Sequence, residues 1–580
     1  MPMPKIDFNW RIGGRAGEGI MVSGLLMSKT FTRGGLHIFT NTEHPSLIRG
    51  GHNTIRIRAS DQPVHAQVDT VHLLVALNQD TVDLHAHELP SDGGVIFDPD
   101  VVKNTGNISC KRYPIPLKQI VQEVGGTPVM INMVALGASL ALLRYPIASF
   151  EQLIKEQYAK RKGAEVVKKN IAAARKGAAY VTQYFSSDFS WEIRPDALPA
   201  QRMFISGNQA TALGAVAAGC KWMSAYPMTP ATSIMQYLVG WERKTGMIIK
   251  QTEDEIAAMA MAVGAGHVGV RSMTATSGGG FALMSEMLSL AGMTETPVVA
   301  INVTRPGPST GLPTRTEQSD LRFVLHTGHG EFPRVVVSPG SVEESFSLTA
   351  EAFNIAEKYQ LPVIVLTDKY LAESYTDQDF FDVKSIAIAR GKLLTPAQAK
   401  KLKAYARYKL TDDGVSPRTL PGYPNTRFRA TGNEHDETGA ITEDQDIRRA
   451  MVEKRMRKLE TLAKELPQPV LIGPAHAAIT LVGFGSTKGP ILEAMEILNK
   501  KNIHVNYLQI TYLHPFPSAT VQRILSSVKL PIIIENNYTA QLAGLIRQET
   551  CIAIEKKLLK YDGLPFSAMK LAEYITRLVH

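Results

Sequence analysis

The sequence is poor in cysteine, with only Cys110, Cys220 and Cys551 in 580 residues, far apart from one another. A disulfide framework needs cysteines in matched sets, and zinc or iron–sulfur sites need several of them close together. The sequence therefore argues against a disulfide-rich secreted scaffold. It also argues against a zinc or iron–sulfur site built within this chain alone, and we predict no metal ligand here.

Long apolar runs and targeting segments are also missing. No window approaches the roughly 18–20 consecutive apolar residues of a membrane span, and the start MPMPKIDFNW resembles no secretory signal. The net charge of +9 is modest for this length, without the basic runs of a nucleic-acid binder. We expect a cytoplasmic protein with neither a membrane nor a nucleic-acid partner. The positive charge has two open interpretations: steering of an acidic protein partner, and an ordinary solvated surface.

The length and the pattern of the chain predict several α/β domains. A chain of 580 residues exceeds one hydrophobic core. Ile6, Phe8, Trp10 and Ile12 alternate with polar residues, as in a half-buried strand, and a glycine-rich turn and an apolar helix follow. Further short strands alternate with helices, which indicates a parallel sheet. We interpret residues 1–190 as the first domain.

The rest of the chain divides by composition. A second α/β domain covers about 200–385, with strand–turn–helix junctions at Tyr226–Thr232 and Thr274–Phe281. Residues 386–475 are polar and turn-rich, with a lysine-rich helix and a charged helix at 445–465, and we expect an extended interdomain arm. A third α/β domain covers 476–580 and opens with ITLVGFGSTKG.

The turn after the first strand is a candidate anion site. Gly14, Arg15, Gly17 and Gly19 lie between a strand and a helix N-terminus, where free backbone N–H groups bind phosphate. The spacing matches neither the dinucleotide fingerprint nor a phosphate loop with lysine, which disfavours a nucleotide triphosphatase. Phosphate or coenzyme A (CoA) binding and a plain tight turn are equally favoured. Three basic side chains would suit a polyanion if they converge: Arg15, Arg49 and His52.

Two motifs of the second domain have both a structural and a functional interpretation. In YPMTPAT, two prolines pre-order the loop and hold Thr229, which suits the orientation of a small polar substrate or an ordinary strand-ending turn. In Thr252–Glu255, the spacing is that of a capping box, with Glu255 closing back onto the helix start. Alternatively, Glu255 faces an apolar cleft and bonds the N1′ nitrogen of a thiamine aminopyrimidine.

Two glycine- and proline-rich segments follow. Thr274–Phe281 (TATSGGGF) predicts close helix–sheet packing or backbone approach to a cofactor. Arg305–Asp320 (RPGPSTGLPTRTEQSD) follows an apolar strand, at the edge where open α/β sheets bind ligands. An arginine there matches a carboxylate in a bidentate way. The prolines favour a shaped binding loop over a simple surface loop.

These motifs together resemble a known family. In this order, YPMTPAT, EDEIAAMAMAVGA, TATSGGGFALMSE and RPGPSTGLPTRTEQSDL resemble the α subunit of 2-oxoacid:ferredoxin oxidoreductases, closest to the 2-oxoglutarate type. Residues 1–190 resemble the family's γ domain. Residues 476–580, with LVGFGSTKGP and IIIENNYTAQLAG, resemble its transketolase C-terminal-like domain. The resemblance implies that residues 200–385 bind the pyrimidine half of thiamine diphosphate.

The resemblance also implies residue roles. Glu255 matches the glutamate that activates the aminopyrimidine, and Thr229 would touch the reacting end of the substrate. Arg305 and Thr314 would hold the oxoacid. The remaining contacts to the cofactor would come from Tyr226, Pro227, Ser277 and Gly278. The family's YPITP motif has Met228 in place of isoleucine here, a volume-conserving exchange.

The parts that the sequence lacks imply partners. No GDG-then-Asn segment for a magnesium diphosphate occurs, and no cysteine group for a cluster. The resemblance implies a β subunit that brings Mg²⁺ and a [4Fe–4S] cluster, in an α2β2 assembly that uses CoA and ferredoxin and is inactive without β. Such enzymes serve the tricarboxylic acid cycle or CO2 fixation. Pyruvate or a branched-chain oxoacid is the alternative substrate, and a non-catalytic CoA-binding scaffold the alternative class.

Overall fold

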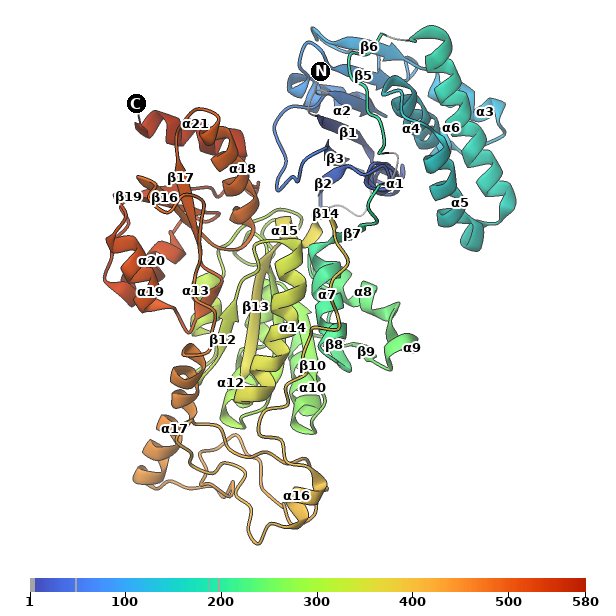
Figure 1. The fold of residues 1–580 in the computed structure, drawn as a ribbon. Helices are drawn as coiled ribbons and strands as arrows, with labels where there is room; N and C mark the ends of the chain where they lie inside the picture. Colours follow the sequence, from blue (N-terminus) through green and yellow to red (C-terminus); the bar gives the residue numbers. More distant parts are fainter. Residues whose placement is uncertain (1–5, 47–49, 187, 197–198, 580) are drawn as a thin grey trace. The chain divides into compact units, whose positions relative to one another are not determined.

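The computed structural model describes residues 6–46, 50–186, 188–196 and 199–579. The chain forms two compact units (Figure 1). The first combines Met1–Ile205 with the segments Ser374–Phe381 and Ser567–Leu578, and the second contains Ser206–Glu373 and Asp382–Phe566. Three sheets with flanking helices carry the fold, so the predicted α/β class is confirmed.

A mixed sheet forms the centre of the first unit. Its strands are β1 (Asp7–Arg15), β2 (His37–Glu43), β3 (His52–Ser60), β4 (Leu73–Ala76), β5 (Gly94–Phe97), β6 (Lys111–Pro114), β7 (Met203–Ser206) and β14 (Tyr375–Gln378). The order is β6-β5-β4-β1-β3-β2-β14-β7. Strands β1, β4, β5 and β6 are parallel, whereas β3 pairs antiparallel with β1 and β2, and β14 with β2. The prediction of a parallel sheet is therefore wrong for β2, β3 and β14. Parallel neighbours need a crossover connection, and the described residues between β2 and β3 contain no helix.

Helices pack closely against this sheet. They are α1 (Ile20–Arg33), α2 (Gln79–His85), α3 (Leu117–Glu123), α4 (Ile131–Leu142), α5 (Ala148–Lys162) and α6 (Ala164–Tyr184), and α21 (Ala568–Val579) belongs to the same compact unit. Helices α4 and α6 approach so closely that a Cβ at Gly137 would lie 2.0 Å from the carbonyl oxygen of Ala174. The core under α1 and α5 contains the fully buried Trp10, Phe31 and Phe150.

The glycine-rich turn is shorter than the predicted Gly13–Gly19. Strand β1 continues through Gly13 and Gly14 to Arg15, because β3 pairs with it along its whole length. Gly13 has no room for a side chain, since a Cβ there would lie 2.6 Å from Cγ2 of Thr81. The predicted strand thus extends into the glycines, and only the residues after Arg15 turn.

Among the described residues, no single helix is long and apolar enough to cross a membrane. One pair of helices, Leu117–Glu123 with Pro128–Leu142, has the length and composition of a membrane span, but it is bent by 119° at the break between them. Helix α4, which supplies most of that pair, is largely buried in the first unit.

The second unit contains a sheet with the order β18-β12-β13-β11-β10-β8-β9. Its strands are β8 (Trp222–Ala225), β9 (Ile248–Gln251), β10 (Ser272–Thr276), β11 (Val298–Thr304), β12 (Val335–Val337), β13 (Pro362–Asp368) and β18 (Tyr512–His514). All pairs are parallel except β12 with β18. Helices α7 (Gly207–Ala217), α8 (Thr232–Val239) and α14 (Val342–Tyr359) share a core with one face, which includes Val299 and Ile301.

The other face of that sheet carries α10 (Glu255–His267), α12 (Ser285–Met293) and α13 (Leu321–His326) over Val298 and Ala300. Residues alternate between the two faces, as in any strand. The short α11 (Gly278–Leu283) and α15 (Lys369–Glu373) follow β10 and β13 directly. The carboxyl ends of the parallel strands therefore meet at one edge, where the predicted site motifs lie.

A five-stranded sheet with the order β15-β17-β16-β19-β20 forms the C-terminal domain. Its strands are β15 (Leu471–Ile472), β16 (Ile479–Gly483), β17 (Val505–Gln509), β19 (Leu530–Glu535) and β20 (Lys556–Leu559), with helices α18 (Lys488–Asn499), α19 (Ser518–Ser526) and α20 (Gln541–Thr550). Strand β18 extends from this domain to pair with β12 of the neighbouring sheet. The two domains of the second unit thus share one continuous core.

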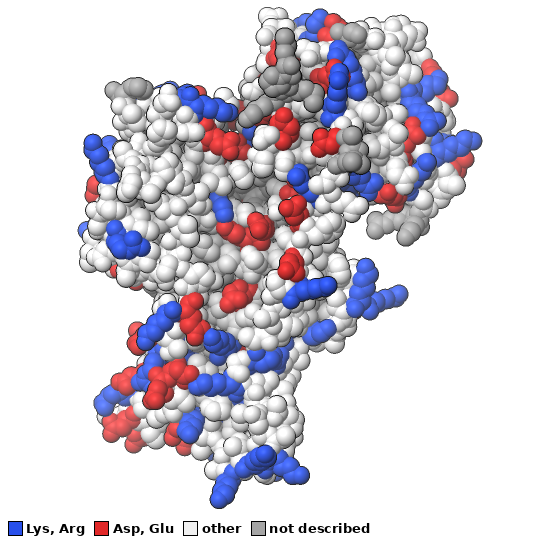
Figure 2. Space-filling view, viewed as in Figure 1, with Lys and Arg blue, Asp and Glu red and all other residues white. Residues whose placement is uncertain are grey.

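The arm, residues 386–475, is mostly irregular chain. Helix α17 (Gln445–Ala463) confirms the predicted charged helix, whereas the lysine-rich helix shrinks to α16 (Pro396–Lys400). Beyond α16 the chain makes long-range contacts in place of helical ones: the buried Arg407 guanidinium donates to Gln360 Oε1 and to the backbone oxygen of Glu295. Figure 2 shows both signs of charge mixed over the arm, as on a solvated surface.

Buried ion pairs hold the arm to the rest of the second unit. Lys454 Nζ lies 2.5 Å from Glu295 Oε1, and Lys458 Nζ lies 2.6 Å from Glu295 Oε2, with all three side chains at 0% exposure. Burial opposes ionisation of Glu295, but the two lysines outweigh it and lower the pKa of Glu295. This carboxylate is therefore a charged structural group.

Candidate active site

Glu255 lies at the first position of α10, after the end of β9. The predicted capping box is wrong: Asp254 is the N-cap, and its Oδ1 accepts from the backbone N–H of Ala257 at 2.8 Å. Thr252 donates its hydroxyl to the backbone oxygen of Asp254 instead of capping the helix. A charged carboxylate next to the helix start accepts more strongly than a hydroxyl further away. Glu255 is therefore not needed to close the helix end.

The Glu255 side chain is buried without a cation. It is 3% exposed, and among the described residues no lysine, arginine or histidine forms an ion pair with it. Thr276 Oγ1 donates to Glu255 Oε1 at a long 3.5 Å. Burial raises the pKa of Glu255, which the backbone N–H and Thr276 offset only in part. Such a carboxyl is a candidate for binding a ligand nitrogen.

The glycine run after β10 makes room for this carboxyl. A Cβ at Gly280 would lie 2.3 Å from Glu255 Oε1 and 2.1 Å from Thr276 Oγ1. A Cβ at Gly278 would lie 2.6 Å from Oδ2 of Asp320. Ser277, the N-cap of α11, is fully buried, and its hydroxyl has no hydrogen-bond partner. Close packing explains the glycines, whereas the unpaired hydroxyl of Ser277 lacks a structural reason.

The YPMTPAT loop lies beside this carboxyl. Thr276 Oγ1 contacts Met228 Sδ at 3.7 Å, and Arg305 Nη1 donates to the backbone oxygen of Thr229 at 2.7 Å. Asn208, a fully buried residue that the sequence analysis missed, donates to the backbone oxygen of Pro230 at 2.8 Å. Glu255, Thr229 and Arg305 are thus brought together through Thr276 and the loop.

The other predicted residues differ in exposure. Tyr226 is 39% exposed and Pro227 is half-buried at the start of the loop. Thr314 is buried, and among the described residues no hydrogen bond joins it to Arg305 or Thr229. The structure gathers Glu255, Thr229 and Arg305, but it does not link Thr314 to them.

Asp320 is a further residue that the sequence analysis did not single out. It accepts from Asn302 Nδ2 at 3.0 Å, and burial raises its pKa. Burial also lowers the pKa of Arg305, and the charge of Asp320 opposes this shift. Asp320 is the last residue of the proline-rich loop and precedes α13. Aspartate is common at such a position, so the local sequence does not mark Asp320 as a functional residue.

In the glycine turn of the first unit, one backbone N–H group is already bonded by a side chain of the turn itself. Glu18 Oε2 accepts from the backbone N–H of Arg15 at 2.6 Å, and a Cβ at Gly14 would lie 2.5 Å from this atom. Gly17 and Gly19 have φ angles of 93° and 77°, which favour glycine. Gly19 is the N-cap of α1 and provides no side chain, so first-turn N–H groups lack a side-chain cap.

Two of the three basic residues expected near that turn, Arg15 and His52, have different surroundings. His52 Nε2 lies 2.9 Å from His85 Nε2, and burial lowers the pKa of His52 to about 4. His85 in turn bonds Glu88, which Arg11 holds at 2.7 Å. Arg15 is exposed, and Arg49 lies outside the described residues. His52 therefore belongs to an inner network, a role that its sequence position did not indicate.

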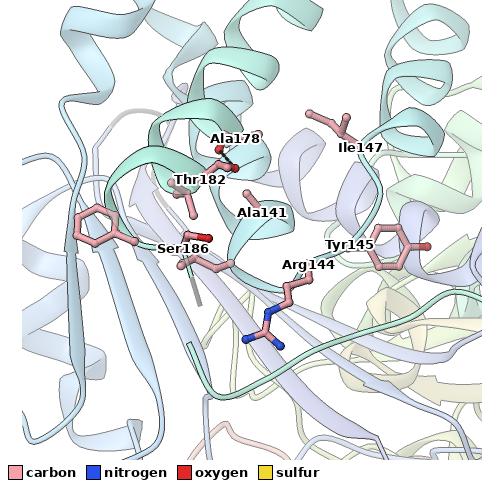
Figure 3. Close-up of a pocket in the computed structure, with 10 residues that line it drawn as sticks. Ala141, Arg144, Tyr145, Ile147, Ala178, Thr182 and Ser186 are labelled. Carbon is pink, nitrogen blue, oxygen red and sulfur yellow. Dashed lines mark hydrogen bonds between the residues drawn. The ribbon is translucent and has the colours of Figure 1, made fainter. Parts of the chain in front are cut away.

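A separate cavity of about 380 Å³ lies in the first unit between the ends of α4 and α6. Figure 3 shows its lining, with the hydroxyls of Thr182 and Ser186 and the guanidinium of Arg144. Arg144 pairs with Glu192 at 2.9 Å. None of the predicted site residues lines this cavity.

Three regions of the chain match described protein families. Residues 213–454 match "Pyruvate flavodoxin/ferredoxin oxidoreductase, thiamine diP-bdg". Residues 9–180 match "Pyruvate ferredoxin/flavodoxin oxidoreductase", and residues 477–564 match "Pyruvate:ferredoxin oxidoreductase core domain II". The fold and the site therefore define a multidomain oxidoreductase subunit with a thiamine-diphosphate-binding domain.

Full-length relatives narrow this class. The chain is 32% identical to 2-oxoacid:ferredoxin oxidoreductase 2, subunit alpha, of Aeropyrum pernix, over 99% of this chain and 98% of the relative. It is 29% identical to 2-oxoglutarate oxidoreductase subunit KorA of Mycobacterium tuberculosis, over 97% and 90%. A solved 2-oxoglutarate:ferredoxin oxidoreductase from Magnetococcus marinus, with 2-oxoglutarate, coenzyme A and succinyl-CoA bound, covers 100% of both chains at 34% identity and a TM-score of 0.93. The chain belongs to the 2-oxoacid:ferredoxin oxidoreductase family, as an α subunit with a γ-like domain.

Proposed function

We propose that this chain is the α subunit of a 2-oxoglutarate:ferredoxin oxidoreductase. The reaction interconverts 2-oxoglutarate, CoA and oxidised ferredoxin with succinyl-CoA, CO2 and reduced ferredoxin. The observation that carries the substrate assignment is the full-length likeness to the Magnetococcus marinus enzyme, whose structure contains 2-oxoglutarate and succinyl-CoA. Pyruvate and branched-chain oxoacids are the competing substrates within the same family.

The residues around Glu255 fit the pyrimidine half of thiamine diphosphate. A buried carboxyl with a raised pKa and no cation suits a hydrogen bond to a ring nitrogen, and the unpaired hydroxyl of Ser277 offers a second polar contact. Tyr226, Pro227 and Gly278 complete the proposed cofactor contacts. When bound, thiamine diphosphate supplies the nucleophilic carbon and the electron sink for decarboxylation. Glu255 holds the proton at that nitrogen and orients the ring.

Arg305, Thr229 and Thr314 are the proposed oxoacid contacts. Arg305 has a guanidinium already oriented by the Thr229 backbone oxygen, with donors left for a carboxylate. Thr229 lies on the neighbouring YPMTPAT loop, and its hydroxyl would orient the reacting end of the substrate. Binding and orientation of this kind are what the protein contributes to catalysis by a bound cofactor.

A β subunit is the proposed partner, with Mg²⁺, the diphosphate contacts and a [4Fe–4S] cluster. An exposed apolar face beside Glu255 supports this: Ile256 is 48% exposed, Met261 37% and Leu283 49%. Interface cores are apolar and depleted of charge. We propose an α2β2 complex that passes electrons to ferredoxin. In the first unit, we propose Gly14, Arg15, Gly17 and Gly19 as a contact for CoA phosphates.

The test is CoA-dependent viologen reduction by the α–β complex purified without oxygen, with 2-oxoglutarate and pyruvate compared. We expect kcat/KM for 2-oxoglutarate to exceed that for pyruvate by more than about 100-fold, the discrimination that a paired charged group gives. A preference for pyruvate would overturn the substrate assignment and leave the family membership intact. Turnover by the isolated chain would overturn the need for β.

A further inference from the structure

The loop at 305–320 is held firmly at both ends and open between them. Arg305 is bonded to the Thr229 backbone oxygen at its start, and residues 307–312 are exposed. The second half of the loop, from Thr316 onwards, is buried or half-buried. What fixes this second half decides where the substrate-binding half lies.

Gln318 attaches the loop to the C-terminal domain, to which its four hydrogen bonds among the described residues go. Its backbone N–H donates to the Asn536 oxygen at 2.7 Å, and its backbone oxygen accepts from Asn537 Nδ2 at 3.2 Å. Its side-chain Nε2 donates to the Phe484 oxygen at 2.9 Å, and its Oε1 accepts from the Asn536 N–H at 3.0 Å. A residue that is 4% exposed with four such bonds has one well-defined position.

The C-terminal domain is shaped to receive this amide. Gly485, directly after Phe484, has a φ angle of 57°, and a Cβ there would lie 2.9 Å from Gln318 Nε2. Asn537 is held by the fully buried Glu535, whose Oε2 accepts from Asn537 Nδ2 at 2.8 Å. The glycine motif at 483–487 and the asparagine pair after β19 thus both bind Gln318 and hold this loop.

Neighbouring residues strengthen the attachment. Thr316 donates its backbone N–H to the Gly563 oxygen at 3.1 Å and its hydroxyl to Asp368 Oδ1 at 3.2 Å. Gln541 Nε2 donates to the Ser319 backbone oxygen at 2.8 Å. Thr314 lies two residues before Thr316, so its position depends directly on this cluster.

We propose that Gln318 is a positioning residue for 2-oxoacid binding. The C-terminal domain holds Gln318, and Gln318 holds the loop that presents Arg305 and Thr314. The inference rests on the proposed function for the roles of those two residues. A loop ordered before the substrate arrives avoids an entropy cost on binding. Loosening it therefore weakens oxoacid binding while the reacting groups around Glu255 stay in place.

The test compares two near-isosteric variants in the α–β complex, Gln318→Met and Asn506→Leu. Asn506 is the matched control: it is 1% exposed in the same C-terminal domain, and its amide bonds Pro474 and Thr480, away from the loop. For Gln318→Met we expect KM for the oxoacid to rise about 10-fold or more, with kcat within about twofold and KM for CoA unchanged. For Asn506→Leu we expect both KM values to stay at the wild-type level.

Hydrogen exchange of the loop gives a second readout, independent of activity. Amides of residues 306–316 should exchange faster in Gln318→Met and at the wild-type rate in Asn506→Leu. An unchanged oxoacid KM, or an equal rise in both variants, would overturn the proposal. If the Gln318→Met complex does not assemble, Gln541→Met carries the same expectations, because it releases Ser319. The assays use the oxoacid that the wild type turns over best, so a preference for pyruvate would refute only the substrate assignment.

Discussion

Two buried glutamates in the same unit have opposite surroundings. Glu295 faces Lys454 and Lys458 at 2.5 and 2.6 Å, and its pKa is lowered. Glu255, also buried, has one long contact to Thr276, and its pKa is raised. Burying a carboxylate costs free energy unless partners compensate it.

These surroundings distinguish a buried acid with a structural role from one with a functional role. At the arm junction the protein itself supplies both cations, so the ion pairs are complete and hold the fold together. At Glu255 the protein leaves the carboxyl incompletely paired, next to two loops that lie at the carboxyl ends of strands. An incompletely paired buried acid at such an edge indicates a ligand that completes it.

The largest expected effect is on catalysis. Glu255→Gln in the α–β complex should lower kcat by about 10²–10⁴-fold, the range that positioned acid–base groups contribute. Viologen reduction measures it, and Glu253→Gln, an exposed neighbour with the same charge change, is the control. Retained activity in Glu255→Gln would make this residue a structural one like Glu295.

The next effect is on stability at the arm junction. Lys454→Met should lower the free energy of unfolding by about 3–5 kcal/mol, because it leaves Glu295 underpaired in the interior. Urea unfolding followed by circular dichroism measures the change, with the exposed Lys464→Met as control. A loss similar to that of the control would mean that the buried pairs contribute little to stability.

A substitution at Gly280 tests whether the position of the Glu255 carboxyl matters, without a change of its charge, and we expect a smaller effect. Gly280→Ala should lower kcat by about 10–10²-fold, because the added Cβ displaces the carboxyl and a misplacement of about 1 Å has such effects. Gly279→Ala is the matched control, since its Cβ would come no closer than 4.0 Å to the Ser309 oxygen. Equal losses in both variants would point to helix packing, and not to the position of Glu255.

The smallest effect concerns pH. The folded pKa of Glu255 is raised by burial, so the native state holds more protons and stability falls as the pH rises above the unfolded value. Glu255→Gln should therefore stabilise the purified chain at pH 7.5, and the gain should vanish below about pH 4.3, the unfolded pKa. The folded pKa of Glu295 is lowered, so its charge stabilises the fold above that pH, and Glu295→Gln should destabilise the chain at pH 7.5. Thermal melts of both variants across this pH range measure these changes in stability. If both variants were stabilised at pH 7.5, or both destabilised, the comparison of the two glutamates would be wrong.

Much of the local structure was predictable from local pattern. Alternating apolar residues predicted β1, and the charged stretch predicted α17 almost to its ends. The prediction failed where long-range contacts compete with local preference. Beyond the short α16 the chain carries Arg407, which bonds the distant Glu295 backbone oxygen, and pairing with β3 extends β1 through two glycines.

The α/β class, the family resemblance and the position of each site motif after a strand could be predicted from the residues alone, because these depend on neighbours along the chain. Which acids have charged partners depends instead on contacts between distant parts of the chain. Lys454, one of the two partners of Glu295, lies 159 residues away in the arm, and the C-terminal contacts of Gln318 lie 166 to 219 residues away. Charge compensation acts through space over a few ångströms, so no spacing in the sequence reveals that Glu255 has no cationic partner among the described residues while Glu295 has two.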